Sequence, residues 1–254
     1  GDGEDVDTDA DTDTDTDTET DTDTDTDTDT DTDTDTDTDT DCTHYEGPDT
    51  RDAQLWGVVT DVDGCLVEHR AQMCNDSCIV GEADAGAFVY DWGTLPALPH
   101  AFQTVPIDGD PLWPEVLLPH TVQSGVTGRV DVVLPRFPAL YTIPDTTAEV
   151  ALGGGFALTI GLDRVTLDFG YEPDRLAAVL VEPAHWPPLE VQGEVVAVWY
   201  LGPTFTTSEQ GVGFRIPDTW GAIEAETYDV WYASYKDEAF VLADTVAMEG
   251  GELV

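Results

Sequence analysis

The sequence predicts an all-β protein in which two β-sandwich domains follow a disordered N-terminal tether. From residue 52 onward, short runs rich in Val, Leu, Phe, Tyr and Trp are interrupted by Gly or Pro about every 8–12 residues, a spacing typical of sandwiches. No segment shows a sustained apolar period of 3.6 residues, so long helices are not expected. We expect a tether over 1–45, a first domain over 52–119 and a second over 120–254.

The tether is an alternation of Asp and Thr that runs from Asp7 to Asp41 and is broken only at Ala10 and Glu19. Such a segment cannot bury enough apolar surface to offset the entropy lost on ordering, so we expect it to stay extended and solvated. Its 35 residues would reach at most about 120 Å. Pro-free but Thr-rich, it offers hydroxyls for O-glycosylation. The first candidates are Thr12, Thr14, Thr16 and Thr18.

Acidic residues dominate both parts of the chain. Of the 54 Asp and Glu residues, 21 lie in residues 1–41, which carry no Lys or Arg. The remaining 33 acidic residues face 8 basic ones, so residues 42–254 have a net charge of −25. This balance excludes nucleic acid as a partner, because phosphates require Lys and Arg for neutralisation, and it disfavours adhesion to anionic lipid.

The beginning of the sequence indicates export. It starts at Gly1 without Met, and the acidic start resembles the mature end of a bacterial lipoprotein just after its lipidated cysteine. We therefore expect a lipidated cysteine before Gly1 that serves as an outer-membrane anchor, and a location at the bacterial cell surface, in the outer membrane or outside the cell. No stretch approaches 18 uninterrupted apolar residues, so no spanning helix is predicted.

The four cysteines, Cys42, Cys65, Cys74 and Cys78, predict two disulfides in an exported chain. Three pairings are open. The favoured one closes a hairpin with Cys74–Cys78 and joins the tether to the fold with Cys42–Cys65. The alternative is a zinc site of Cys65, His69, Cys74 and Cys78, although the spacing lacks the usual paired knuckles. Asn75-Asp-Ser77 formally matches a glycosylation sequon, but a turn between two cysteines is the preferred interpretation.

Fourteen strands are predicted in the body, more than one ordinary sandwich contains. They are Leu55–Thr60, Ala71–Met73, Ile79–Val80, Ala87–Asp91, Ala101–Val105, Gly128–Leu134, Ala148–Leu152, Ala157–Leu162, Arg164–Phe169, Leu176–Glu182, Val191–Leu201, Val212–Ile216, Tyr228–Tyr235 and Ala239–Ala247. One or two helical turns are expected near 112–118 and 218–225. In the two Trp-Tyr pairs at 199–200 and 231–232, strand alternation places one ring of each pair inward.

Residues 55–106 resemble the carboxypeptidase regulatory-like fold, a transthyretin-type sandwich. The resemblance lies in the run Leu55-Trp-Gly-Val-Val-Thr-Asp-Val-Asp-Gly, a cysteine-containing strand, and the run Asp84-Ala-Gly-Ala-Phe. Asp63-Gly64 and Asp84-Ala-Gly86 independently supply the turn residues of tight hairpins. Cys65 departs from the small residue or Pro usual there. The resemblance implies a structural or binding role. Residues 120–254 are similar in style to Ig-like modules of bacterial surface proteins.

Catalytic motifs of the common hydrolase, metalloprotease and nucleotide-binding types are absent from the sequence. We therefore expect no catalytic residue, no cofactor and no resident metal. Asp61-Val-Asp63-Gly64 and the acidic pair at 108 and 110 resemble calcium loops but lack the further oxygen ligands, so turns explain them better. Trp113 and Trp186 precede prolines and are candidates for stacking on a glycan or protein ligand, with sandwich lids as the alternative.

These observations predict a non-enzymatic, exported, tethered β-sandwich protein that serves binding or envelope structure. A second hypothesis makes the Asp/Thr tract an O-glycosylated segment that builds a stalk or fibre and self-associates. A third is a carbohydrate-active enzyme that uses a pair of carboxylates.

Overall fold

The computed structural model describes residues 42–84, 86–107, 110–167, 175–189, 191–202, 206–208, 211–218, 221 and 226–253. The Asp/Thr repeat, with Thr12, Thr14, Thr16 and Thr18, lies outside the described residues. Within those residues the protein is all-β, and the only helical elements are two 3₁₀ turns, η1 (Gly153–Gly155) and η2 (Pro183–His185). No helix in this part of the chain is long and apolar enough to cross a membrane.

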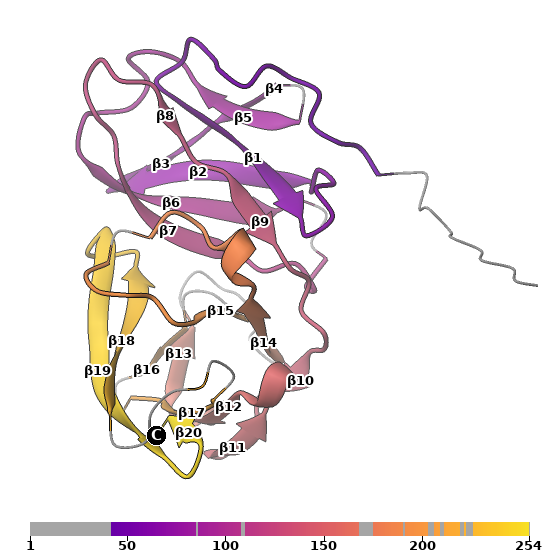
Figure 1. The fold of residues 1–254 in the computed structure, drawn as a ribbon, viewed down its shortest axis with the longest axis vertical. Helices are drawn as coiled ribbons and strands as arrows, with labels where there is room; N and C mark the ends of the chain where they lie inside the picture. Colours follow the sequence, from indigo (N-terminus) through magenta and orange to yellow (C-terminus); the bar gives the residue numbers. More distant parts are fainter. Residues whose placement is uncertain are drawn as a thin grey trace, which may run out of the picture. The chain divides into compact units, whose positions relative to one another are not determined.

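Two sheets form the first sandwich (Figure 1). One contains β4 (Glu82–Asp84), β5 (Ala87–Tyr90), β1 (Leu55–Asp61) and β8 (Gly128–Arg129), and β9 (Val132–Leu134) also pairs with β1. The other contains β3 (Ser77–Val80), β2 (His69–Asn75), β6 (Pro99–Pro106) and β7 (Val116–Thr121).

Strand β1 lies at the centre of its sheet, antiparallel to β5 and parallel to β8 and β9. Gly57 permits the close approach to β8 and β9, because a Cβ at this position would lie 1.8 Å from the Val130 carbonyl oxygen. Where β8 gives way to β9, the Asp131 carboxylate accepts a hydrogen bond from the Val58 backbone N–H at 3.2 Å. A side chain thus replaces the missing backbone acceptor.

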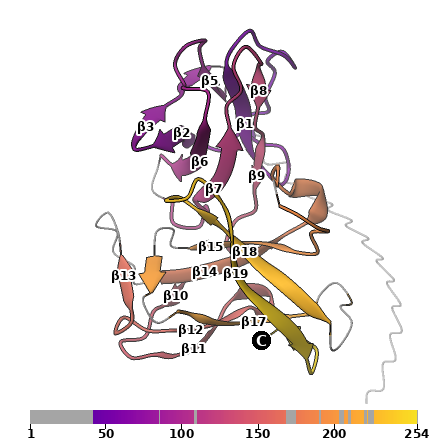
Figure 2. The same cartoon turned by 90° about the vertical axis from the view of Figure 1, so that its left-hand side faces the viewer.

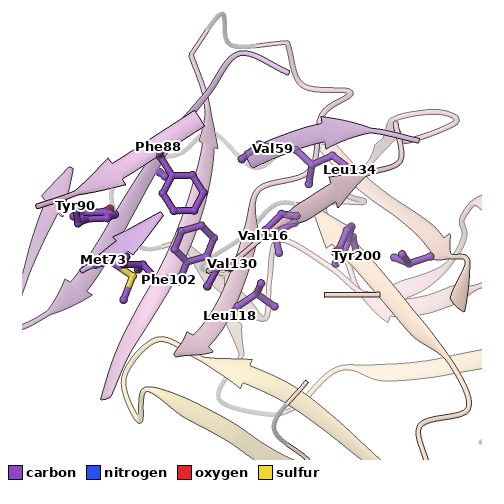
Figure 3. Close-up of a cluster of buried hydrophobic side chains, with 14 of the residues drawn as sticks. Val59, Met73, Phe88, Tyr90, Phe102, Val116, Leu118, Val130, Leu134 and Tyr200 are labelled. Atoms are coloured by element: carbon purple, nitrogen blue, oxygen red, sulfur yellow. The ribbon is translucent and has the colours of Figure 1, made fainter. Parts of the chain in front are cut away.

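The core of the first sandwich is built from the inward residues of both sheets (Figure 3). Phe88 of β5 and Phe102 of β6 meet across the sandwich with ring centroids 5.1 Å apart. Met73 and Phe102 are fully buried, and Leu118 of β7 belongs to the same cluster. Period-two alternation explains why these positions point inward.

The later strands form three further sheets. The first is β10 (Tyr141–Thr142), β14 (Arg175–Val181) and β15 (Val198–Gly202). The second is β11 (Ala148–Ala151), β12 (Ala157–Ile160), β17 (Gly213–Pro217), β20 (Glu252–Leu253), β19 (Ala239–Glu249) and β18 (Thr227–Ser234). The third pairs β13 (Val165–Leu167) with β16 (Thr206–Ser208). Figure 2 shows β18 and β19 as a long twisted ribbon whose upper end reaches β7.

The β10–β14–β15 sheet is covered on both faces. Tyr200 and Val181 belong to the core cluster that contains the first sandwich's residues. Leu176 belongs to a second cluster, and Trp199 packs against that cluster through Phe156, with ring centroids 5.0 Å apart. The expectation that only one ring of Trp199-Tyr200 points inward is therefore wrong, because this strand has a core on each side.

Most predicted strands are present, with shifted ends. The long strand expected from Val191 begins only at Val198. The helical turns expected near 112–118 are wrong, because β7 begins at Val116 and its alternate residues are buried against β6. The segment 218–225 falls largely outside the described residues. The sequence did not predict β4, β10, β16 and β20, which are two or three residues long.

Strand pairing crosses the domain boundary expected at 119/120. Strands β8 and β9 come after this boundary in the sequence, yet they pair with β1 of the first sheet. Residues 41–254 form one compact unit. The assignment of two separate domains remains a prediction.

Candidate functional site

The point where the repeat meets the fold is covalently closed. Cys42 and Cys65 form a disulfide with their Cα atoms 5.3 Å apart, as predicted from the sequence. The same segment is held by its backbone, because Leu66 N–H donates to the Thr43 carbonyl at 2.7 Å and His44 forms a β-bridge with Cys65. We call residues 42–45 with 64–66 the tether joint. Residues 42–45, expected in the tether, are thus attached to the body.

Aromatic and cationic side chains extend this attachment to β1. The rings of Tyr45 and Trp56 lie 6.4 Å apart, and the Arg129 guanidinium sits 4.4 Å from the Trp56 ring centroid. Arg129 also donates to the Asp49 carbonyl oxygen at 3.1 Å, and Arg51 donates to Tyr45 Oη at 3.0 Å. A cation over an indole face contributes about 0.5–2 kcal/mol depending on desolvation, so the segment after the disulfide also has non-covalent support.

A tight turn presents Cys65 to Cys42. The Asp61 carboxylate accepts hydrogen bonds from the backbone N–H groups of Asp63 at 2.9 Å and Cys65 at 2.8 Å. Gly64 has a φ of +82°, which favours glycine. The predicted Asp-Gly turn is confirmed. One Asp61 oxygen accepts both bonds, which explains this acidic loop as a turn.

His44 lies at the centre of the tether joint. Its Nδ1 is 3.0 Å from the Gly64 carbonyl oxygen, and its Nε2 is 3.4 Å from Cys42 Sγ. A carbonyl only accepts, so Nδ1 carries the proton and donates it to Gly64. His44 is not among the site residues predicted from the sequence. The available signal was the Cys42-Thr-His44 spacing, which places two metal-binding side chains on the same side of an extended segment.

The second disulfide, Cys74–Cys78, closes the β2–β3 hairpin, where the two residues are direct cross-strand partners with Cα atoms 4.0 Å apart. The Asn75 side-chain amide donates to the Pro99 carbonyl at 3.1 Å and to Glu238 Oε2 at 2.9 Å. Cys78 Sγ lies 3.4 Å from Tyr235 Oη. The hairpin therefore contacts the turn between β18 and β19, and the sequon asparagine serves that contact.

The predicted zinc alternative is wrong for this structure. Cys65 is bonded to Cys42, and Cys74 is bonded to Cys78, so all four thiols are consumed. Within the described residues, the one group of three metal-binding side chains that the fold gathers is Cys42, His44 and Cys65, whose ligand atoms lie within 4.8 Å of one another. His69 is not in it.

The two tryptophans proposed for ligand stacking are half-buried and pack against the first core cluster. The Arg136 guanidinium lies 5.0 Å from the Trp113 ring centroid, and Arg136 also pairs with Asp110. Trp186 donates its indole N–H to the Val181 carbonyl at 2.9 Å. Both rings thus have intramolecular contacts, and their role in stacking on a ligand stays a prediction.

A cavity of about 340 Å³ lies beside the turn after β1 and is lined by Asp63, Glu182, His185, Val62, Leu180 and Pro135. Its polar groups come from the turn and from η2 with the residue before it. They are not close enough together to count among the metal-binding groups of the described residues.

Two tyrosines of the main core cluster, Tyr90 and Tyr200, are labelled in Figure 3, and their hydroxyls differ in hydrogen bonding. Burial raises the pKa of Tyr90 and that of Tyr200 well above the ordinary value near 10. Tyr90 Oη donates to the Ile79 carbonyl at 3.1 Å. Among the described residues, Tyr200 Oη has no hydrogen-bond partner. Neither tyrosine belongs to the tether joint.

Apolar side chains are exposed on the β18–β19 ribbon. Trp231 is 37% exposed, Tyr232 51% and Leu242 45%. Trp231 is the cross-strand partner of Leu242, next to an irregularity in the register after Val230. The expectation that one ring of Trp231-Tyr232 points into the core is wrong, because among the described residues neither ring belongs to a hydrophobic core cluster.

In comparisons with known proteins, no protein family and no curated sequence matches this chain. The functional proposal below therefore depends on the geometry of the tether joint. This joint fixes the segment that follows the acidic repeat to the turn after β1, and it places an imidazole nitrogen against one sulfur of the linking disulfide.

Proposed function

We propose that this chain is a non-enzymatic, exported bacterial protein that displays a β-sandwich body on an acidic tether for binding or for envelope structure. The observation that carries the proposal is the Cys42–Cys65 disulfide at the first residues of the body. A disulfide at this position transmits a pulling force from the repeat directly to Cys65, which a flexible peptide connection alone does not do.

A pull on the repeat enters the body at Cys42. With the disulfide closed, the load passes directly to Cys65 and on to β2, which pairs on both sides with β3 and β6. Without the disulfide, the load would first pull residues 43–54 away from the body and then pull β1 out of its sheet. The disulfide therefore encloses β1 in the loop 42–65, so that a pull on Cys42 does not peel this strand away from its N-terminal end, which suits a body displayed at a distance from its anchor.

The same chemistry supports the proposed compartment. Disulfides persist in oxidising environments such as the periplasm and the cell surface. Both disulfides bridge residues that the fold brings together, 23 and 4 positions apart in sequence. The large negative charge favours solubility. An outer-membrane lipoprotein is the form of display that we propose.

Residues 55–106 are proposed to be a carboxypeptidase regulatory-like sandwich. The tight Asp-Gly turn after β1 and the turn before β5, where Gly86 has a φ of +78°, support this assignment. A binding or structural role would follow from it. The exposed rings of Trp231 and Tyr232 on β18, with Leu242 on β19, offer apolar contact area for a ligand.

The single lysine allows a direct test. Lys236 lies in the exposed turn between β18 and β19. Intact cells that produce the full protein are treated with a membrane-impermeant amine reagent, and the protein is then digested and mapped by mass spectrometry without reductant. We expect modified Lys236 and both disulfide-linked peptides. A cytoplasmic protein in the same cells serves as the unlabelled control. Labelling only after lysis, or free Cys42 and Cys65, would contradict the proposal.

A further inference from the structure

We propose that Cys42, His44 and Cys65 become a binding site for Zn²⁺ when the disulfide between the two cysteines is reduced. The three ligand atoms lie within 4.8 Å of one another. Two thiolates and one imidazole are ligands that Zn²⁺ prefers, and three protein ligands leave a fourth tetrahedral position for water. His44 is exposed and the two cysteines are half-buried, so reductant and metal reach the site from solvent.

The orientation of His44 suits a metal ligand. Because Nδ1 donates its proton to the Gly64 carbonyl, Nε2 keeps its lone pair and points toward Cys42 Sγ. Metal-binding histidines usually donate their other ring N–H to a carbonyl or carboxylate, which fixes the tautomer and the ring plane. In the oxidised protein, His44 Nε2 faces the Cys42 sulfur, which is part of the disulfide and therefore cannot bind a metal as a thiolate.

The backbone keeps the three residues together after reduction. The hydrogen bond from Leu66 N–H to the Thr43 carbonyl, the bridge between His44 and Cys65, and the bond from Cys65 N–H to Asp61 involve no sulfur. Two sulfurs on one tetrahedral Zn²⁺ lie roughly 3.8 Å apart, given Zn–S distances of about 2.3 Å. Rotation of the two side chains reaches this separation from Cα atoms that are 5.3 Å apart.

The conversion balances as two steps. A dithiol reductant supplies two electrons and two protons; the S–S bond between Cys42 and Cys65 breaks, and a disulfide forms in the reductant. Zn²⁺ then displaces the two thiol protons and binds both sulfurs and His44 Nε2. The cross-link between Cys42 and Cys65 is thus a disulfide under oxidising conditions and a bound Zn²⁺ under reducing ones. This inference holds whether or not the protein is exported.

Cobalt is the probe that reports the ligands directly. The full chain is reduced with a phosphine under anaerobic conditions, and Co²⁺ is titrated with excess Mg²⁺ present to occupy the acidic repeat. We expect thiolate-to-cobalt charge-transfer bands and tetrahedral d–d bands that saturate at one Co²⁺ per chain and disappear when Zn²⁺ is added. The oxidised protein should show none of these bands.

Two histidine variants locate the site. His44→Ala should weaken Co²⁺ binding at least tenfold and shift the d–d bands, whereas His69→Ala should leave both unchanged. Far-UV circular dichroism of each oxidised variant confirms that it is folded. The Cys74→Ser/Cys78→Ser variant should keep the bands. Equal binding by wild type and His44→Ala, loss in His69→Ala, or no bands in the reduced wild type would each overturn the proposal.

Discussion

The first sandwich, residues 42–134, and the later strands, residues 141–253, are held together in different ways. The first contains both disulfides and fully buried side chains such as Met73 and Phe102. Apart from the residues that they contribute to the main cluster, the later strands have two smaller clusters, and among the described residues one of these contains three buried side chains, Val246, Met248 and Leu253. They also expose aromatic rings on the β18–β19 ribbon.

The difference shows where this molecule concentrates its stability. Both disulfides lie in the first sandwich, which also supplies most of the largest core cluster, while Val181 and Tyr200 of the later strands complete that cluster. The β18–β19 ribbon depends on side-chain contacts with the first sandwich, such as Asn75 with Glu238 and Phe240 against the main cluster. Protein stability is not uniform, and regions with few buried apolar contacts open at lower free energy. We therefore expect the ribbon to open before the first sandwich.

The two methionines provide the largest test of this comparison, because one lies in each region. Met73 is fully buried in the main cluster, and Met248 is 2% exposed in the small cluster. Truncation of a buried Met to Ala costs about 2–5 kcal/mol. We expect a loss in the free energy of unfolding of about 4 kcal/mol for Met73→Ala and about 2 kcal/mol for Met248→Ala, because a small cluster near the surface collapses more easily.

Urea denaturation followed by tryptophan fluorescence measures both variants under the same conditions. Equal losses would show that the small cluster is as tightly packed as the main one. A larger loss for Met248→Ala would reverse the comparison.

The disulfides give the next effect. They span 23 and 4 positions. The chain-entropy model gives about 3 kcal/mol for the larger loop and about 2 kcal/mol for the smaller. We expect Cys42→Ser/Cys65→Ser to lose more stability than Cys74→Ser/Cys78→Ser, as measured by the shift in denaturation midpoint of the metal-free proteins. A greater loss for the smaller loop would place the more important covalent link at the contact between β3 and the β18–β19 turn.

Local patterns predicted the tether joint well. Four cysteines, an Asp-Gly turn and alternating apolar runs are short-range signals, so the disulfide pairs, the all-β class and most strands could be read from the sequence. For His44 the sequence offered only its spacing from Cys42, because its proximity to Gly64 depends on a bridge between segments about twenty residues apart.

Longer-range features were beyond a single sequence for a related reason. The parallel pairing of β1 with β8 and β9 joins residues some 70 positions apart, and no local pattern encodes it. Trp199 and Tyr200 are both covered because a second cluster lies behind their sheet. Alternation predicts which side a residue faces, but it does not predict how many sides of a sheet are buried.

The smallest effects come from the two buried tyrosines, one at each end of the main cluster, and they should differ in sign. Tyr90 Oη donates a hydrogen bond to Ile79, so Tyr90→Phe leaves that buried carbonyl without its donor and should cost about 1 kcal/mol.

Tyr200 Oη is desolvated, as its raised pKa reflects, and has no partner among the described residues. Removing a buried hydroxyl that makes no hydrogen bond breaks no interaction and relieves the free-energy cost of its desolvation. Tyr200→Phe should therefore raise the free energy of unfolding by about 1 kcal/mol, measured by urea denaturation beside Tyr90→Phe. A loss in both variants would show that Tyr200 Oη is satisfied in solution and that the boundary between the two regions is as well bonded as the interior of the first sandwich.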